Sequence, residues 1–101
     1  MIIGKLYQIK QYSWMLVPSK EHAHACTAAH GSHSNVHEHH VAYWSKHLKC
    51  NINSVSLNDI FCLLEEDGDY LKVLSSNGEI GWMSYPKDQD WTKGCFEEVK
   101  Q

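Results

Sequence analysis

The alternation of apolar and polar side chains predicts β-strands towards both ends of this chain. Residues 5–17 form two short, aromatic and β-rich segments, and Pro18 ends that pattern. From residue 53 onward, strand-like segments return: VSLNDIFCLLEE, DYLKVLSS, GEIGWMSY and CFEEVK. Turn-forming residues separate the longer segments at 66–69 and 76–79, the second with the Asn-Gly pair typical of hairpins. We therefore expect a mainly β fold with five or six antiparallel strands.

Residues 19–49 interrupt this pattern and favour helix. Alanine, histidine and serine dominate the segment, and Ser19 after Pro18 is a suitable N-cap. One model is a single helix of about 28 residues; the other has helices of about 10 and 14 residues separated by a GSHSN turn. The glycine, serines and asparagine of that turn weaken a continuous helix, which slightly favours the second model. We expect one or two helices inserted into a single domain that spans residues 1–101.

Histidine is concentrated in this insertion, and its spacing is helical. Seven of the eight histidines lie between residues 22 and 40. Residues that are three or four positions apart lie on the same side of a helix, so these spacings would place them in one stripe about 100° wide. The members of this stripe are His22, Cys26, His30, His33, His37, His40, Trp44 and His47. An adjacent sector is rich in alanine, so the stripe borders a face that is suited to close packing.

Imidazole and thiolate bind Zn²⁺, Cu²⁺ and Ni²⁺, so the stripe is a candidate metal site. The candidate ligands are Cys26, His30, His33, His37 and His40. Their spacing matches no zinc-finger or metalloprotease motif. The alternatives are a stripe that packs or contacts solvent without binding metal, and a helix that loosens when its imidazoles become charged at low pH.

Charge and composition argue against several functional classes. The net charge is −3 and the chain contains no arginine, which disfavours binding to nucleic acid or to an anionic membrane. The four cysteines lie far apart without a C-x-x-C pair, no signal peptide is recognisable, and no apolar run reaches membrane-spanning length. We therefore expect a cytoplasmic protein. No catalytic motif stands out either. Only Glu21 or Glu38 lies near enough in sequence to orient His30 as the base for Cys26, and no oxyanion-type glycine loop is visible, so we expect no enzyme.

The second half of the chain resembles the SH3-like β-barrel family, in its bacterial as well as its peptide-binding form. The segments LNDIFCLL at 57–64, GDYLKV at 68–73 and GEIGWM at 78–83 follow the order of that family's strands. Asn58 stands where the family usually has glycine. The resemblance implies a small barrel, with the His-rich insertion in the loop between its first two long strands.

The resemblance also implies a candidate binding surface. Where members of the family bind peptides they use an aromatic groove, and Tyr70 matches the groove tryptophan by position. The candidate surface residues are Tyr70, Trp82, Tyr85 and Trp14. We expect a non-enzymatic module that binds a protein or peptide, or itself, through these aromatics, unless the inserted helix covers them. The second hypothesis is a metal-binding or metal-sensing accessory protein that uses the histidine stripe with Zn, Ni or Cu.

Overall fold

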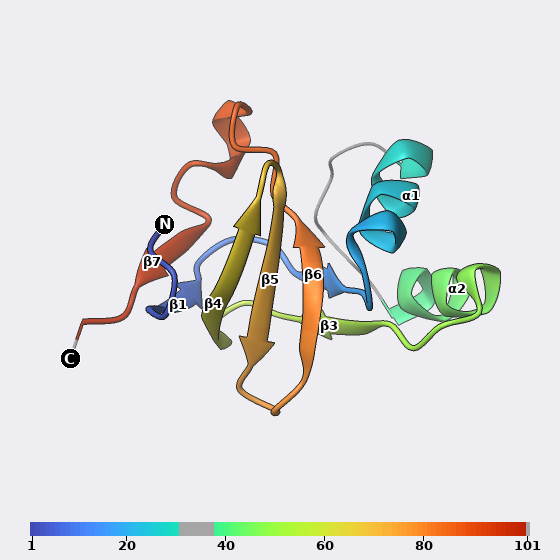
Figure 1. The fold of residues 1–101 in the computed structure, drawn as a ribbon, viewed down its shortest axis with the longest axis horizontal. Coiled ribbons are helices and arrows are strands. Elements are labelled where there is room, and N and C mark those ends of the chain that lie inside the picture. Colours follow the sequence, from blue (N-terminus) through green and yellow to red (C-terminus); the bar gives the residue numbers. More distant parts are fainter. Residues whose placement is uncertain (31–37, 101) are drawn as a thin grey trace.

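In the computed structural model, a helical pair interrupts a series of short antiparallel strands (Figure 1). The structure describes residues 1–30 and 38–100, without the side chains of 27–30, 38–40 and 91. The elements in chain order are β1 (Leu6–Ile9), β2 (Trp14–Leu16), α1 (Lys20–His30), α2 (Glu38–Leu48), β3 (Asn53–Val55), β4 (Ile60–Asp67), β5 (Tyr70–Ser75), β6 (Ile80–Ser84), the 3-10 helix η1 (Asp90–Thr92) and β7 (Phe96–Glu98). The expected fold class, mainly β with a helical insertion, is confirmed.

The strands form two sheets rather than a closed barrel. Five of them lie in the order β6-β5-β4-β1-β7, and all their pairings are antiparallel. The other two, β2 and β3, form a small second sheet. The two sheets are joined by Val17, which exchanges backbone hydrogen bonds of 2.9 and 2.7 Å with Trp82 of β6. The expectation of a barrel with five or six strands is corrected in this respect: the described residues form seven strands in two sheets.

A turn between β3 and β4 accounts for the additional strand. The segment VSLNDIFCLLEE was expected to be a single strand, but it is broken at residues 56–59. Asn58 adopts a φ of +74°, and the Asp59 carboxylate accepts a 2.8 Å hydrogen bond from the backbone N–H of Ser56. Asparagine tolerates this left-handed conformation better than most residues, so the chain turns here without a glycine.

The main core lies between the two sheets and is filled from alternate positions of the strands. Along β5 every second side chain is buried, including Leu71 and Val73. On β4 the alternation buries Phe61 and Leu63 and ends at a register shift after Leu63. Tyr7 and Phe61 are direct partners across β1 and β4, and their rings stack with centroids 5.9 Å apart. Such cross-strand pairs are the unit from which a sheet gains stability.

The two sheets approach so closely at one point that only glycine fits there. A Cβ atom on Gly81 would lie 2.6 Å from Cγ of Leu16 and 2.9 Å from the carbonyl oxygen of Val17. The missing side chain therefore allows the end of β2 to cross β6, which is also where the sheets share hydrogen bonds.

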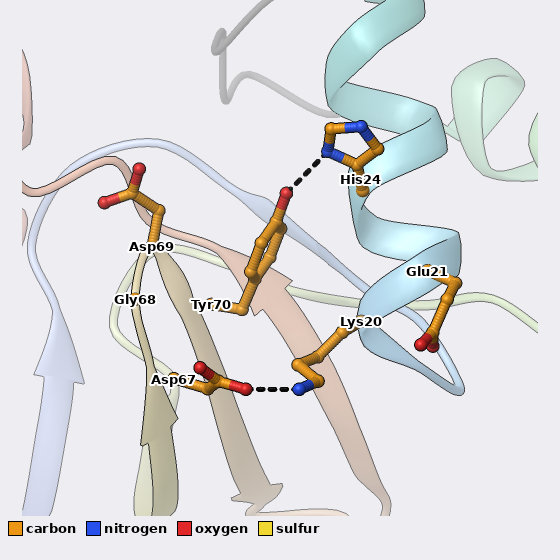
Figure 2. A pocket seen from close by; sticks show the side chains of 7 residues that line it. All are labelled: Lys20, Glu21, His24, Asp67, Gly68, Asp69 and Tyr70. Atoms are coloured by element: carbon orange, nitrogen blue, oxygen red, sulfur yellow. Dashed lines mark hydrogen bonds and ion pairs between the residues drawn. The ribbon is translucent and has the colours of Figure 1, made fainter.

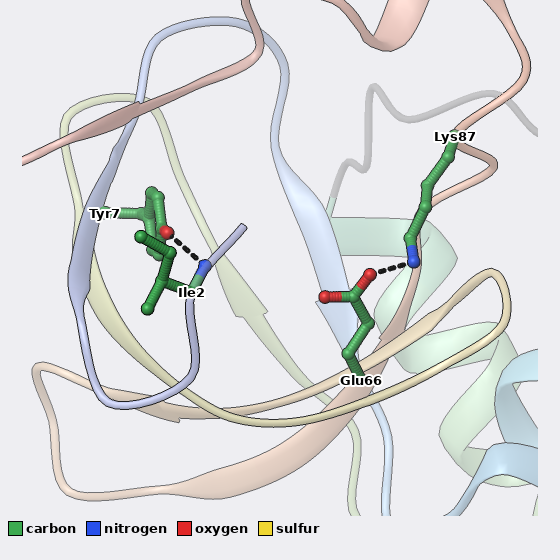
Figure 3. Close-up of polar contacts among 4 residues, drawn as sticks. All are labelled: Ile2, Tyr7, Glu66 and Lys87. Carbon is green, nitrogen blue, oxygen red and sulfur yellow. Dashed lines mark hydrogen bonds and ion pairs between the residues drawn. The ribbon is translucent and has the colours of Figure 1, made fainter.

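Two polar contacts tie peripheral segments to the sheets (Figure 3). The backbone N–H of Ile2 donates a 2.6 Å hydrogen bond to the hydroxyl of Tyr7, which holds the N-terminal segment against β1. The ammonium of Lys87, just after β6, forms an ion pair with the carboxylate of Glu66 on β4. The second contact fastens the loop that leads to η1.

The insertion contains two helices, as the composition slightly favoured. Helix α1 begins where expected, because the hydroxyl of Ser19 accepts a 3.2 Å hydrogen bond from the backbone N–H of His22. The expected GSHSN turn, at residues 31–35, lies outside the described residues. Both helices lie on the β6 side of the molecule, far from the two chain ends (Figure 1). Neither helix, as far as each is described, is long and apolar enough to cross a membrane.

A second hydrophobic cluster connects the helices to the sheets. Its buried members are Val17, Ala23, Cys26, Trp44, Ile52 and Trp82. Cys26 and Trp44 belong to the predicted histidine stripe, and both are nearly inaccessible to solvent. At these two positions the stripe is packed rather than exposed.

Candidate functional site

An open groove lies between helix α1 and the turn that joins β4 to β5 (Figure 2). It has a volume of about 480 Å³. The residues that line it are Lys20, Glu21, His24, Asp67, Gly68, Asp69 and Tyr70. The groove therefore combines the phenol ring of Tyr70 with five other ionisable side chains, all within two short segments.

The tight β4–β5 turn places the aromatic ring beside the acidic residues. Gly68 adopts a φ of +60°, which lets the chain reverse so that Asp67 and Tyr70 face each other across the two strands. Tyr70 is half-buried and reaches from β5 towards α1, while Asp69 lies on the other side of it (Figure 2). The sheet thus supplies one wall of the groove and the helix supplies the other.

Helix α1 contacts this turn through two side chains that are one helical turn apart. Nδ1 of His24 lies 2.8 Å from the hydroxyl oxygen of Tyr70, and the two rings meet edge to face with centroids 6.4 Å apart. The ammonium of Lys20 forms an ion pair with the carboxylate of Asp67. Residues four apart on a helix share a face, so both contacts follow from one orientation of α1.

The ammonium of Lys20 has a second neighbour, the indole of Trp82. It lies 5.6 Å from the ring centroid, within the range of a cation–π interaction. The hydrogen bond to Asp67 and the negative charge of that residue raise the pKa of Lys20. The groove thus already holds one cation between a carboxylate and an aromatic face.

The groove is net negative while His24 is neutral, because three carboxylates and a single ammonium line it. Hydrogen bonds from its own backbone N–H and from the Ser19 hydroxyl lower the pKa of Glu21, so this carboxylate stays ionised. Burial, and next the charge of Asp69, raise the pKa of Tyr70, so the phenol stays protonated at neutral pH. A positively charged group is the ligand that such a surface attracts.

The four aromatic residues expected on a binding surface occupy different environments. Tyr70 lines the groove, and Trp82 is 9 % exposed beneath Lys20. Trp14 is corrected: it is 2 % exposed and packs in the main core against Tyr85 and Phe96, with ring centroids 5.8 and 5.0 Å away. The second sheet turns this side chain inward, where it cannot meet a partner.

Tyr85 belongs to the edge of the core rather than to the groove. Its ring stacks on Phe96 at 4.8 Å, and its hydroxyl donates a 3.0 Å hydrogen bond to the carbonyl oxygen of Thr92. Burial raises its pKa. These contacts hold η1 against the sheets, so Tyr85 supports the fold.

The candidate metal ligands are only partly described. Burial, and next the charge of Cys50, raise the pKa of Cys26 to about 11, so its thiol stays protonated at neutral pH, which disfavours metal binding. The side chains of His30, His33, His37 and His40 lie outside the described part of the chain. Among the side chains that are described, no three histidine, cysteine or acidic groups are arranged to hold a metal ion. The metal site stays a prediction.

Sequence reasoning missed most of the groove. Residues 66–69 were predicted only as a turn between strands, and Lys20 and Glu21 only as part of the helical segment 19–49. His24 falls outside the histidine stripe, so its partner could not be inferred from helical spacing. One available signal was the position of the acidic turn directly before Tyr70, which had been singled out by the family resemblance.

We compared the chain with known proteins to find a precedent for this site. No protein-family model, no curated protein and no solved structure matches it. The function therefore has to be argued from the residues of the groove and from the resemblance described above.

Proposed function

We propose that this protein is a non-enzymatic SH3-like binding module whose groove between α1 and the β4–β5 turn binds a cationic side chain of a protein or peptide. One observation carries the proposal: the half-buried ring of Tyr70 lies in an open groove with more carboxylates than cations. A ligand cation would gain charge–charge attraction from the carboxylates and a cation–π contact from the ring.

The conformation of Asn58 supports the resemblance to the SH3-like family. This residue replaces the glycine that is usual in the family, and its φ of +74° lies in the region where glycine is favoured. The strand segments that carry the resemblance, β4, β5 and β6, are consecutive antiparallel neighbours. The insertion lies between β2 and β3, and its helix α1 forms one wall of the groove.

The proposal is tested by nuclear magnetic resonance titration of the full chain with two capped tripeptides, Ala-Arg-Ala and Ala-Glu-Ala. We expect the arginine peptide to shift the backbone amide signals of residues 67–70, and the glutamate peptide to leave them unchanged. The affinity should fall as salt is added, because exposed charges are screened. Equal shifts with both peptides, or none with either, would contradict the proposal.

Two variants separate the contributions of the ring and the charge. The variant Tyr70→Leu should bind the arginine peptide about two- to fivefold more weakly, because the loss of an exposed cation–π contact usually has an effect of this size. Tyr43→Leu is the matched control, because Tyr43 is an exposed tyrosine on α2. Asp69→Asn should weaken binding in the same direction, whereas Asp90→Asn, an equal charge change on η1, should not.

A further inference from the structure

Lys20 occupies the kind of position that the proposed ligand would require. Its ammonium lies between the carboxylate of Asp67 and the ring face of Trp82. Lys10, Lys87 and Lys93 also form ion pairs with carboxylates. Among the described residues, however, Lys20 is the one lysine that also lies over an aromatic ring. The feature that needs an explanation is this combination of partners.

We infer that Lys20 is a built-in competitor for the groove: it holds the site between Asp67 and Trp82 that the cation of a ligand takes, and an arginine displaces it. This inference rests on the proposed function, whose ligand it specifies. Tyr70 lines the groove with Asp67 and packs against the cluster that contains Trp82, so a cation that replaces the ammonium meets Asp67 and Trp82 beside the Tyr70 ring.

The ion pair is suited to displacement. The side chains of Lys20 and Asp67 are 40 % and 53 % exposed, and exposed ion pairs of this kind contribute little to stability. Lys20 also lies in the first turn of α1, where the helix dipole disfavours a positive charge. The lysine side chain can therefore leave Asp67 for solvent at small cost.

Helix α1 does not have to move when Lys20 leaves. Ala23 and Cys26 are buried in the second cluster, and His24 keeps its contact with the Tyr70 hydroxyl. The competition is thus local, between one flexible side chain and the ligand.

Arginine is the cation best able to win this competition. A guanidinium can form two parallel hydrogen bonds with one carboxylate and can also stack on an aromatic face, whereas an ammonium acts as a point charge. The chain itself contains no arginine, so no internal side chain has this advantage.

The test compares Lys20→Met with wild type in a titration with Ala-Arg-Ala, followed by the indole N–H signal of Trp82. Methionine keeps the length of the side chain and removes the charge. We expect the variant to bind the arginine peptide about two- to fivefold more tightly, since the competing exposed ion pair is gone. In wild type we also expect Ala-Arg-Ala to bind more tightly than Ala-Lys-Ala.

The matched control is Lys87→Met. The Lys87 side chain is as exposed as that of Lys20 and also pairs with a carboxylate, that of Glu66, and its replacement changes the net charge equally. We expect it to leave the affinity within twofold of wild type. If Lys20→Met alters the chemical shifts of the sheets, Lys20→Gln replaces it.

The possible failures are distinguishable. If wild type binds the arginine peptide but Lys20→Met binds no more tightly than Lys87→Met, the competition is overturned and the proposed function stands. Equal wild-type affinity for the arginine and lysine peptides overturns the preference for arginine. If neither wild type nor any variant binds, the proposed function falls and this inference falls with it.

Discussion

The described residues form two hydrophobic clusters that share strand β6 but are specified in different ways. Met83 of β6 points into the main core, and its neighbour Trp82 points into the cluster beneath the helices. The main core is assembled from alternate positions of paired strands, so local sequence pattern and hydrogen-bond register specify it together. The second cluster is assembled from single residues of separate segments. Strand β6 therefore borders two cores: the sequence pattern determines the main core, and tertiary packing alone determines the second cluster.

The largest effect should come from the main core. Leu63 is completely buried on β4, and replacing it with alanine should lower the free energy of unfolding by about 3 kcal/mol, because a cavity remains in a rigid sheet. Urea denaturation followed by tryptophan fluorescence measures this. Leu57→Ala, at an exposed leucine in the turn before β4, should change stability by less than about 0.5 kcal/mol. A similar loss for both variants would show that Leu63 is not a core residue.

In the second cluster, Trp44→Ala should cost no more than this, about 3 kcal/mol, because α2 can shift to close part of the cavity. The sharper expectation concerns where protection is lost. Hydrogen exchange should quicken in α1 and α2 and stay slow in β4 and β5, since elements can open locally without global unfolding. Tyr43→Ala, the exposed neighbour on α2, should leave both regions unchanged. An equal loss of protection in strands and helices would mean that the two clusters unfold as one.

The features that were correctly predicted from the sequence are those that neighbouring residues determine. The alternation along β5, the Asn-Gly hairpin and the Ser19 cap all depend on residues close together in the chain. The break between β3 and β4 was missed because asparagine adopts the left-handed conformation without the glycine that marks most such turns.

The groove could not be predicted because its two walls are far apart in sequence. His24 and Tyr70 are separated by 46 positions, and Lys20 and Asp67 by 47. Nothing in the alternation of β2 states whether Trp14 faces the core or solvent; that depends on where the second sheet lies. The family resemblance identified Tyr70, but the helix that covers this side of the sheet belongs to the insertion, for which the family has no counterpart.

The junction between the two clusters can be disturbed directly at Gly81. An alanine Cβ there would collide with Leu16 and with the Val17 carbonyl that bonds to Trp82, so Gly81→Ala should cost about 2 kcal/mol. Thermal unfolding measures the loss, and hydrogen exchange should show the Trp82 amide exposed. Gly78→Ala is the control: its φ is +84° but no atom lies near, so it should cost only about 1 kcal/mol of backbone strain. A larger cost at Gly78 than at Gly81 would mean that the two sheets are not in close contact.

The last effect appears only in alkaline solution, and it concerns a single proton in the second cluster. Burial raises the pKa of Cys26 from its ordinary value of 9.0 to about 11 in the folded protein. Between these two pH values the Cys26 thiol of the unfolded chain has lost a proton that the folded chain retains. The stability that the protonated thiol contributes is therefore complete below pH 9 and is lost as the pH rises towards 11. Stability should therefore fall across that interval, and less steeply for Cys26→Ala than for wild type.

The slopes of stability against pH have to be compared between variants, because Cys26 is not the sole group involved. Burial also raises the pKa of Cys50, Cys95 and Tyr85, so these groups lower the stability of every variant as the pH rises. Cys62→Ala, at a partly exposed thiol on β4, is the matched substitution outside the second cluster. Urea denaturation at pH 8, 9, 10 and 11 gives each slope. If Cys26→Ala follows the same curve as Cys62→Ala, solvent reaches the Cys26 thiol, and the cluster beneath the helices is looser than the main core in a way that its static burial does not reveal.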